Sequence, residues 1–238
     1  MTATALRVLA QLRHDPRTVA MVVVVPVVLL TLLWWIYDDG GPVFQRVGPA
    51  LLALFPVIIM FLITSITTLR ERRSGTLERL LSLPLSKVSF LLGYALAFGL
   101  VAVVQALVAS ALMLGPLGLE TAGPWGLLVL VAVLDSLLAV ALGLFVSAFA
   151  NTEFQAVQFM PAIVLPQFLL CGLLVPRDEL PRALEYVSNV LPLSYAVDAM
   201  NAVSTQDSPD LTLELSVLVG FVVGVLLLGA ATLRRRTP

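Results

Sequence analysis

The residue best placed to do chemistry is an acid inside an otherwise apolar run. Asp135 lies near the middle of residues 124–150, and no other formal charge lies so deep in an apolar run of this chain. A charge at the centre of a membrane helix costs about 2.5–3.5 kcal/mol on insertion scales, so a polar partner, a water-filled cavity or protonation must offset it. Gln105, midway along residues 88–114, is a candidate partner. Two interpretations stay open: a substrate-contact or proton-relay residue, or a structural hydrogen bond.

The second candidate is the segment 70–87, which reads R-E-R-R-S-G-T-L-E-R-L-L-S-L-P-L-S-K and carries five of the fourteen Lys and Arg residues. Its leucines at helical spacing form one stripe: Leu77, Leu80 and Leu81. Residues 74–76 suit a helix start, and Pro84 ends the helix because the residue before a proline avoids helical geometry. A leucine stripe needs a membrane or protein partner, so the segment predicts a basic contact helix. The alternative is a solvated loop that only sets the topology.

Several catalytic and cofactor motifs do not occur in the sequence. The phosphate-binding loop G-x-x-x-x-G-K-[ST] needs a lysine after a glycine, whereas the only lysine, Lys87, follows Ser86. Neither G-x-S-x-G nor H-E-x-x-H is present. One cysteine, Cys171, and one histidine, His14, offer no disulfide pair and no metal-ligand cluster. We therefore expect no enzyme of these classes, no metal site and no ATP bound through that loop.

The elements that carry these residues are predicted to cross a membrane. The chain is 59% hydrophobic and 12% charged, with a mean hydropathy of +1.01, whereas a soluble domain is about one-quarter charged. A span needs about 20 mostly apolar residues, and six runs qualify: 19–36, 47–69, 88–114, 124–150, 157–175 and 212–233. The runs are continuous rather than alternating, which favours helices over a barrel. We expect an all-α membrane protein whose residues 1–238 form a single transmembrane domain.

The basic residues predict the orientation. With each run crossing once and the N-terminus inside, eleven of the fourteen fall on the cytoplasmic side: Arg7, Arg13, Arg17, Arg70, Arg72, Arg73, Arg79, Lys87 and Arg234 to Arg236. Cytoplasmic loops carry such an excess of Lys and Arg. We therefore expect a multi-pass protein of the plasma membrane with both termini in the cytoplasm.

Residues 4–15 form an amphipathic stretch before the first span. Apolar residues recur at helical spacing on one face (Ala5, Val8, Leu9, Leu12), and polar residues mark the other (Arg7, Gln11, His14). This pattern is typical of a helix lying in the headgroup layer; the alternative is a disordered basic tail. Asp15 and Pro16 then predict the N-cap and first residue of the next helix.

Three of the predicted spans contain prolines in their interior, among them Pro26, Pro56, Pro161 and Pro166. Each lacks an N–H, and a neighbouring helix can satisfy the carbonyl that this frees.

The segment 176–211 is too polar to span and too apolar for a plain loop. One helical stripe follows Pro176 (Leu180, Leu184, Val187), Pro192 breaks the chain, and residues 193–200 begin a second short helix. We predict a helical hairpin that dips into the outer leaflet before the last span; the alternative is an amphipathic loop on the surface.

Two of these segments resemble one protein family. Residues 70–86 are similar to the loop after the second span of type-2 ATP-binding-cassette (ABC) exporter permeases, roughly R-E-x-x-x-G-T-x-E-x-L-x-x-x-P-x-S/T. The matching residues are Arg70, Glu71, Gly75, Thr76, Glu78, Leu80, Pro84 and Ser86. Residues 191–200 resemble the family's P-L-T-Y-x-x-x-x-x-R, with Ser194 for Thr and Asn201 where a basic residue is common. The chain looks most like the drug-resistance, daunorubicin-type branch.

The resemblance implies a permease that binds no nucleotide itself. It would pair with a second permease and with two separate ATPase subunits, which bind ATP and Mg, and it would bind no nucleic acid. Residues 75–83 would be the coupling helix that docks on the ATPase, with Leu77, Leu80 and Leu81 in the contact. An elbow helix (Leu6, Leu9, Leu12, Arg13) would lie beside it, and a hairpin at 177–198 (Pro192, Leu193, Tyr195) would close the outer end.

The expected function is therefore export of an amphipathic or hydrophobic drug, lipid or natural product. Two alternatives stay open: a proton-coupled secondary transporter that relies on Asp135, and a membrane scaffold that transports nothing. The sequence does not give the substrate, the permease partner or the role of Asp135.

Overall fold

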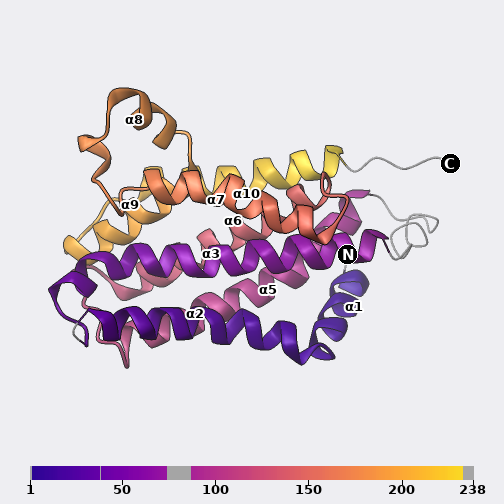
Figure 1. Ribbon diagram of the computed structural model, residues 1–238, viewed down its shortest axis with the longest axis horizontal. Coiled ribbons are helices and arrows are strands. Elements are labelled where there is room, and N and C mark those ends of the chain that lie inside the picture. Colours follow the sequence, from indigo (N-terminus) through magenta and orange to yellow (C-terminus); the bar gives the residue numbers. More distant parts are fainter. Residues whose placement is uncertain (1, 38, 74–86, 233–238) are drawn as a thin grey trace.

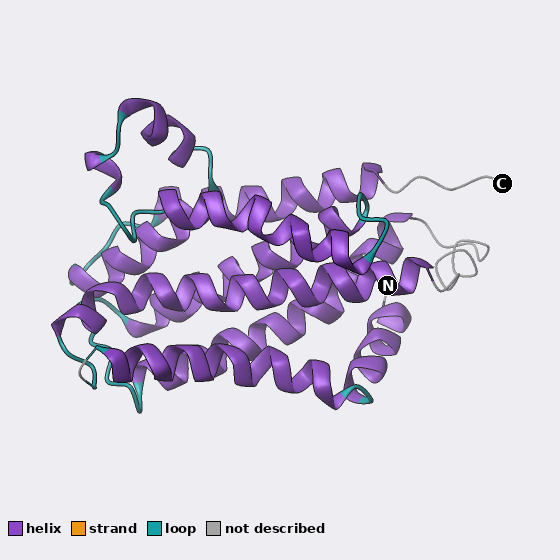
Figure 2. Ribbon diagram, in the orientation of Figure 1, coloured by secondary structure: helices purple, strands orange, loops and turns teal. Residues whose placement is uncertain are grey.

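The computed structural model describes residues 2–37, 39–73 and 87–232, and all of its regular elements there are helices (Figure 2). They are α1 (Thr2–Arg13), α2 (Pro16–Ile36), α3 (Pro42–Arg73), α5 (Lys87–Leu114), α6 (Trp125–Ser147), α7 (Glu153–Leu170), the 3₁₀ turn η1 (Arg177–Glu179), α8 (Arg182–Ser188), α9 (Pro192–Thr205) and α10 (Thr212–Thr232). The all-α class predicted from continuous apolar runs is confirmed. The predicted coupling helix at 75–83 lies outside the described residues.

The long helices lie side by side, and α3 and α6 form the centre of the bundle (Figure 1). α3 contacts α2, α5, α6, α7 and α9, while α6 also packs against α5 and α10. Gly143 of α6 makes this close packing feasible, because a Cβ there would lie 2.8 Å from the carbonyl oxygen of Phe61 in α3. Large buried side chains fill the interior, among them Phe44, Phe61, Phe98 and Leu128.

Among the described residues, five helices are long and apolar enough to cross a membrane: α2, α3, α5 from Leu91, α6 and α10. α7, which contains most of the predicted fifth span, is not one of them. The predicted range 157–175 extends beyond the end of this helix, which begins at Glu153 and ends at Leu170. Thr152 caps its start by accepting from the Gln155 amide at 3.1 Å, and Gly172, at φ +91°, turns the chain beyond its end.

Local side-chain chemistry determines where α2 begins. The Asp15 carboxylate accepts from the backbone N–H of Thr18 at 3.2 Å, and Pro16 occupies the first helical position. The predicted N-cap is therefore confirmed. Hydrogen bonds from the Thr18 hydroxyl and backbone lower the pKa of the Asp15 carboxyl, which keeps it charged at the positive end of the helix dipole.

α1 crosses the end of the bundle and packs against α5 (Figure 1). Ala5, Val8 and Leu12 are buried, as their spacing predicted. Leu6, which the resemblance assigned to the elbow, is 67% exposed. The helical rotation of about 100° per residue carries it away from the face of α1 that packs against α5. Arg13 is exposed as well, and Leu9 is half-buried.

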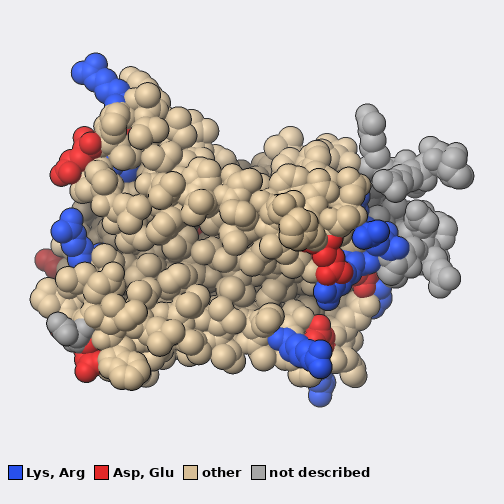
Figure 3. Space-filling view, viewed as in Figure 1, with Lys and Arg blue, Asp and Glu red and all other residues tan. Residues whose placement is uncertain are grey.

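Charged side chains gather at the two ends of the bundle, with a broad uncharged band between them on the face shown in Figure 3. The first helix and the last turn of α10 lie at the same end (Figure 1). This distribution is what a bilayer-spanning bundle requires, because charge is costly at the membrane centre.

Candidate functional site

Three consecutive side chains at the end of α3 reach three different parts of the bundle. Arg70 forms a two-pronged ion pair with Glu153 of α7, with both N–O distances at 2.8 Å. Glu71 accepts from Arg7 of α1 at 2.9 Å and from the Tyr94 hydroxyl of α5 at 2.5 Å. Arg72 donates to the backbone carbonyl of Ser147 at the end of α6. We call Arg70, Glu71 and Arg72 the α3 hub.

The geometry of the hub follows from the helix itself. Successive residues of an α-helix point about 100° apart, so three neighbours sample three directions around the α3 axis. Gln11 of α1 adds a further bond to Glu71 at 2.8 Å. The end of α3 is thereby tied to α1, α5, α6 and α7, immediately before residues 74–86.

Electrostatic contacts keep Arg7 and Glu71 charged. Partial burial lowers the pKa of the Arg7 guanidinium, but the hydrogen bond to Glu71 and the negative charge of that carboxylate raise it by more, so the net pKa lies above the ordinary value. The Glu71 side chain is only 12% exposed, so Arg7, Gln11 and Tyr94 replace water around it. The sequence placed Arg7 and Gln11 on the polar face of α1; that face meets Glu71 as well as solvent.

Of the residues predicted to couple to an ATPase, Arg70 and Glu71 form this hub. The others lie outside the described residues: Gly75, Thr76, Leu77, Glu78, Leu80, Leu81 and Pro84. The hub partners Tyr94, Glu153 and Ser147 were missed. Glu153 carried a signal, since it follows the N-cap Thr152 at a helix start, but nothing in the sequence pairs it with Arg70.

Gln105 does not hydrogen-bond to Asp135, so the candidate pairing was wrong. Its side-chain amide instead donates to the backbone carbonyl of Val22 in α2, at 2.8 Å and fully buried. Val22 is four residues before Pro26, which has no N–H to offer that carbonyl. Gln105 therefore replaces the hydrogen bond that Pro26 removes, as the prolines within spans predicted.

Asp135 is 1% exposed on α6, and neither carboxylate oxygen has a hydrogen-bond partner among the described residues. It is not among the residues that line the cavity described next. The structural hydrogen bond that was one interpretation of Asp135 is not formed within the described part of the chain.

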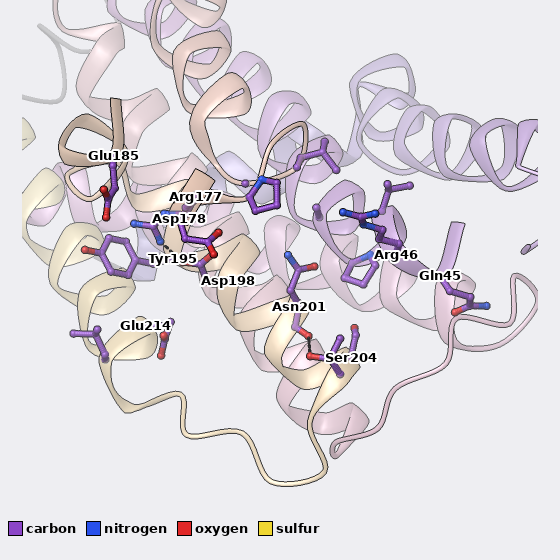
Figure 4. Close-up of a pocket in the computed structure, with 18 of the residues that line it drawn as sticks. Gln45, Arg46, Arg177, Asp178, Glu185, Tyr195, Asp198, Asn201, Ser204 and Glu214 are labelled. Atoms are coloured by element: carbon purple, nitrogen blue, oxygen red, sulfur yellow. Dashed lines mark hydrogen bonds and ion pairs between the residues drawn. The ribbon is translucent and has the colours of Figure 1, made fainter. Parts of the chain in front are cut away.

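A cavity of about 960 Å³ opens at the end of the bundle opposite the hub (Figure 4). The start of α3, the segment 172–178, α8, α9 and the start of α10 contribute to its wall. Several of its side chains are charged: Arg46, Glu120, Arg177, Asp178, Asp198 and Glu214. In Figure 4, Arg177 lies close to Tyr195 and Asp198, with Arg46 across the cavity on α3.

The residues of the predicted hairpin lie at the same end of the molecule as the cavity. The two short helices form on either side of a break before Pro192, as predicted. Pro192 and Leu193 are buried, because α9 packs against α3, α6 and α10, while Tyr195 lines the cavity. The stripe on the first helix is not buried: Leu184 and Val187 are 41% and 47% exposed.

Comparison with known proteins places the chain in a family. Residues 2–204 match the family described as ABC-2 type transporter. The chain is 28% identical over 162 residues to the probable multidrug ABC transporter permease YbhR of Escherichia coli (strain K12), covering 68% of this chain and 44% of that protein. It is 23% identical over 189 residues to the probable multidrug ABC transporter permease YbhS of the same organism, covering 79% and 50%.

A eukaryotic protein also matches. ABC transporter G family member 23 of Dictyostelium discoideum is 24% identical over 194 residues, which cover 79% of this chain and 28% of that protein. The chain spans about half the length of the bacterial relatives it matches. The family match extends over most of the chain, including the hub and most of the residues that line the cavity, and this protein belongs to the ABC-2 type transporter family.

Proposed function

We propose that this chain is the membrane-spanning permease subunit of an ABC exporter, driven by ATP that a separate ATPase subunit hydrolyses. The observation that carries the proposal is the α3 hub. It ties the root of residues 74–86, the segment with the family's coupling motif, to four other helices by the bonds of Arg70, Glu71 and Arg72.

The hub supports a mechanical route. A displacement of the coupling segment by the ATPase would pull on the end of α3. The ion pair to Glu153 and the bonds of Glu71 would carry that displacement to α7 and α1. Charge-assisted pairs with two bonds resist both stretching and rotation better than single contacts do. Such a rigid-body shift is a common form of switching.

The proposal includes the topology. α7, which contains Pro161 and Pro166, crosses the bilayer as the fifth of six spans, and its buried Gln167 side chain accepts from the backbone N–H of Leu193. The end that holds the hub faces the cytoplasm, in keeping with the excess of Arg there. α1 is the elbow helix in the headgroup layer, and the outer cavity faces away from the cytoplasm.

The names of the relatives support a proposal for the cargo, and the family resemblance supports one for the assembly. Two of them carry names that call them probable multidrug permeases, so we propose an amphipathic drug, lipid or natural product as the cargo. The functional unit would hold two permease chains and two ATPases, and the daunorubicin-type branch remains a prediction from sequence.

Capture of an ABC ATPase subunit, taken from a neighbouring reading frame where one is present, tests the proposal. The detergent-solubilised wild type is expected to retain that ATPase, and a Leu77/Leu80/Leu81→Ser variant to lose it. Leu213→Ser, at a side chain 63% exposed at the other end of the bundle, is the matched control and should bind like the wild type. Equal capture by all three, or by none, would refute the coupling surface.

The proton-coupled alternative makes the opposite prediction about Asp135. If a proton gradient drove transport, Asp135→Asn would abolish it and ATP would be dispensable. The permease proposal expects ATP to remain obligatory in the wild type and in Asp135→Asn alike.

A further inference from the structure

The segment between α7 and α9 stands off the bundle (Figure 1). We call residues 173–191, which include η1 and α8, the outer segment. Several of its apolar side chains lie outside the core: Leu174, Tyr186 and Val190 are 58%, 71% and 68% exposed. Apolar burial within the chain therefore does little to keep this segment in place, and its polar contacts must supply the rest.

Those contacts converge on one side chain. Arg177, only 16% exposed, forms an ion pair with Asp198 of α9 and donates to the side-chain oxygen of Asn189 at the far end of the outer segment. Its guanidinium also lies 5.3 Å from the centre of the Tyr195 ring of α9, a cation–π distance. The Tyr195 hydroxyl in turn donates to the carbonyl of Asn189 at 2.7 Å.

The stem of Arg177 covers the hinge of the segment. Gly172 adopts φ +91°, a conformation that favours glycine. The Cγ of Arg177 would lie 3.3 Å from a Cβ at this position, and Asp198 Oδ1 would lie 4.0 Å from it. The next residue inward is Cys171, which is 1% exposed and is the chain's single cysteine.

We propose that Arg177 is a latch that holds the outer segment against α9, and so keeps the adjoining cavity wall in place and Cys171 buried. Breaking the Arg177–Asp198 pair would let the segment swing about Gly172 and open the cavity wall that Arg177 and Tyr195 form. The role in cargo release rests on the proposed function, but the latch itself is a property of this chain alone.

The second tie on the segment differs in kind. The Ser188 hydroxyl donates to the Leu170 carbonyl at 2.8 Å and lies 3.1 Å from the hydroxyl of Ser194. These are neutral bonds, and neutral hydrogen bonds contribute less than those to charged groups. Arg177, which contacts both ends of the segment and α9 at once, is therefore the tie whose loss should matter most.

Labelling of Cys171 measures the latch directly. The purified full chain in lipid nanodiscs, where both faces meet solvent, is treated with a polar maleimide, and the modification rate is followed by mass. Wild type should react slowly. Arg177→Ala should react about tenfold faster or more, the factor expected when a hydrogen-bonded ion pair that opposes opening is lost. Arg182→Ala, which removes an exposed arginine on α8, is the matched control and should react like the wild type.

A milder variant guards against loss of folding. Asp198→Asn keeps the side-chain shape and removes only its charge, and it should also speed labelling, whereas Asp178→Asn on the exposed side of η1 should not. Monodisperse elution and an unchanged melting temperature show that each variant is folded. Equal labelling rates in the wild type, Arg177→Ala and Asp198→Asn, all folded, would overturn the latch.

Transport is a separate readout. If the latch variants label fast and ATP-driven export changes, the latch serves the proposed function. If they label fast in a protein that binds no ATPase, the latch stands and the exporter proposal fails.

Discussion

At the scale of single residues, Glu71 is the residue on which the hub end of the bundle depends most. It is 12% exposed and accepts from three side chains of α1 and α5. A double-mutant cycle with Arg7→Ala and Glu71→Ala should give a coupling of about 1–3 kcal/mol in the free energy of unfolding, as for charged hydrogen bonds away from bulk water. Thermal or denaturant unfolding in detergent measures it. Arg13→Ala, on the exposed face of α1, should change little, and additive effects of Arg7 and Glu71 would contradict the pairing.

The ion pair at the outer end is expected to respond to acid. Burial raises the pKa of the Asp198 carboxyl; Arg177 opposes this and Glu214 adds to it, so the net pKa lies above the usual value. A raised folded-state pKa means that acid favours the folded chain at this group, so global stability is not lost there. What protonation removes is the Arg177–Asp198 pair.

The corresponding measurement compares Cys171 labelling in the wild type with Arg177→Ala, which cancels the pH dependence of the thiol. The ratio of the wild-type rate to the variant rate should rise towards one as the pH falls, and this rise should begin above the range near 4 where an ordinary aspartate titrates. A ratio that does not change with pH would contradict the titration of Asp198. The cavity holds other charged groups that share this environment: Arg46, Glu120, Asp178, Glu185 and Glu214.

Contacts between residues far apart in the sequence were the features that could be predicted least well. The motif singled out Arg70 and Glu71, but their partners Glu153 and Tyr94 are 83 and 23 residues away along the chain. Periodicity reports which face of a helix is apolar, not which helix lies against its polar end. The same reason explains why Gln105 was assigned to Asp135 instead of Val22.

At the scale of elements, Gln105 and Pro26 form a pair that can be tested. Gln105→Leu should lower the free energy of unfolding by about 0.6–1.7 kcal/mol, the range for hydrogen bonds between membrane helices. In a Pro26→Ala background the loss should be smaller, because the new N–H at residue 26 can satisfy the Val22 carbonyl. Equal losses in both backgrounds would contradict this explanation of the bond.

The contact between α3 and α6 makes a steric prediction. Gly143→Ala should destabilise the bundle by about 1–3 kcal/mol, the usual cost of overpacking a tight interior, because the new Cβ would meet the Phe61 carbonyl at 2.8 Å. Gly224→Ala on α10 is the control, since a Cβ there meets nothing within 4 Å. Melting temperatures of the two variants in the same detergent decide the matter, and equal shifts would refute the close approach.

The elements themselves were largely predictable. Continuous apolar runs placed five long helices within a few residues, and Asp15-Pro16 gave the start of α2. α7 was misplaced because Leu173, Leu174 and Val175 extend its apolar run beyond the turn at Gly172. Apolar composition continues across a reversal of the chain, and only backbone geometry shows where the helix stops.

At the scale of the whole molecule, a hub at one end and a latched cavity at the other are joined by α3, whose Arg46 lines the cavity and whose Arg70 to Arg72 form the hub. α3 also contacts α9, which carries the latch residue Asp198. One continuous helix therefore connects the segment proposed to meet the ATPase with the wall proposed to open.

The most direct test is ATP hydrolysis by the partner ATPase with and without this chain in nanodiscs. The account predicts that the hydrolysis rate depends on the chain, and that an Arg70→Ala/Arg72→Ala variant still binds the ATPase but alters its rate less than the wild type does. A rate identical in empty nanodiscs, with the wild type and with the variant would contradict the claim that this chain is the permease of an ATP-driven exporter.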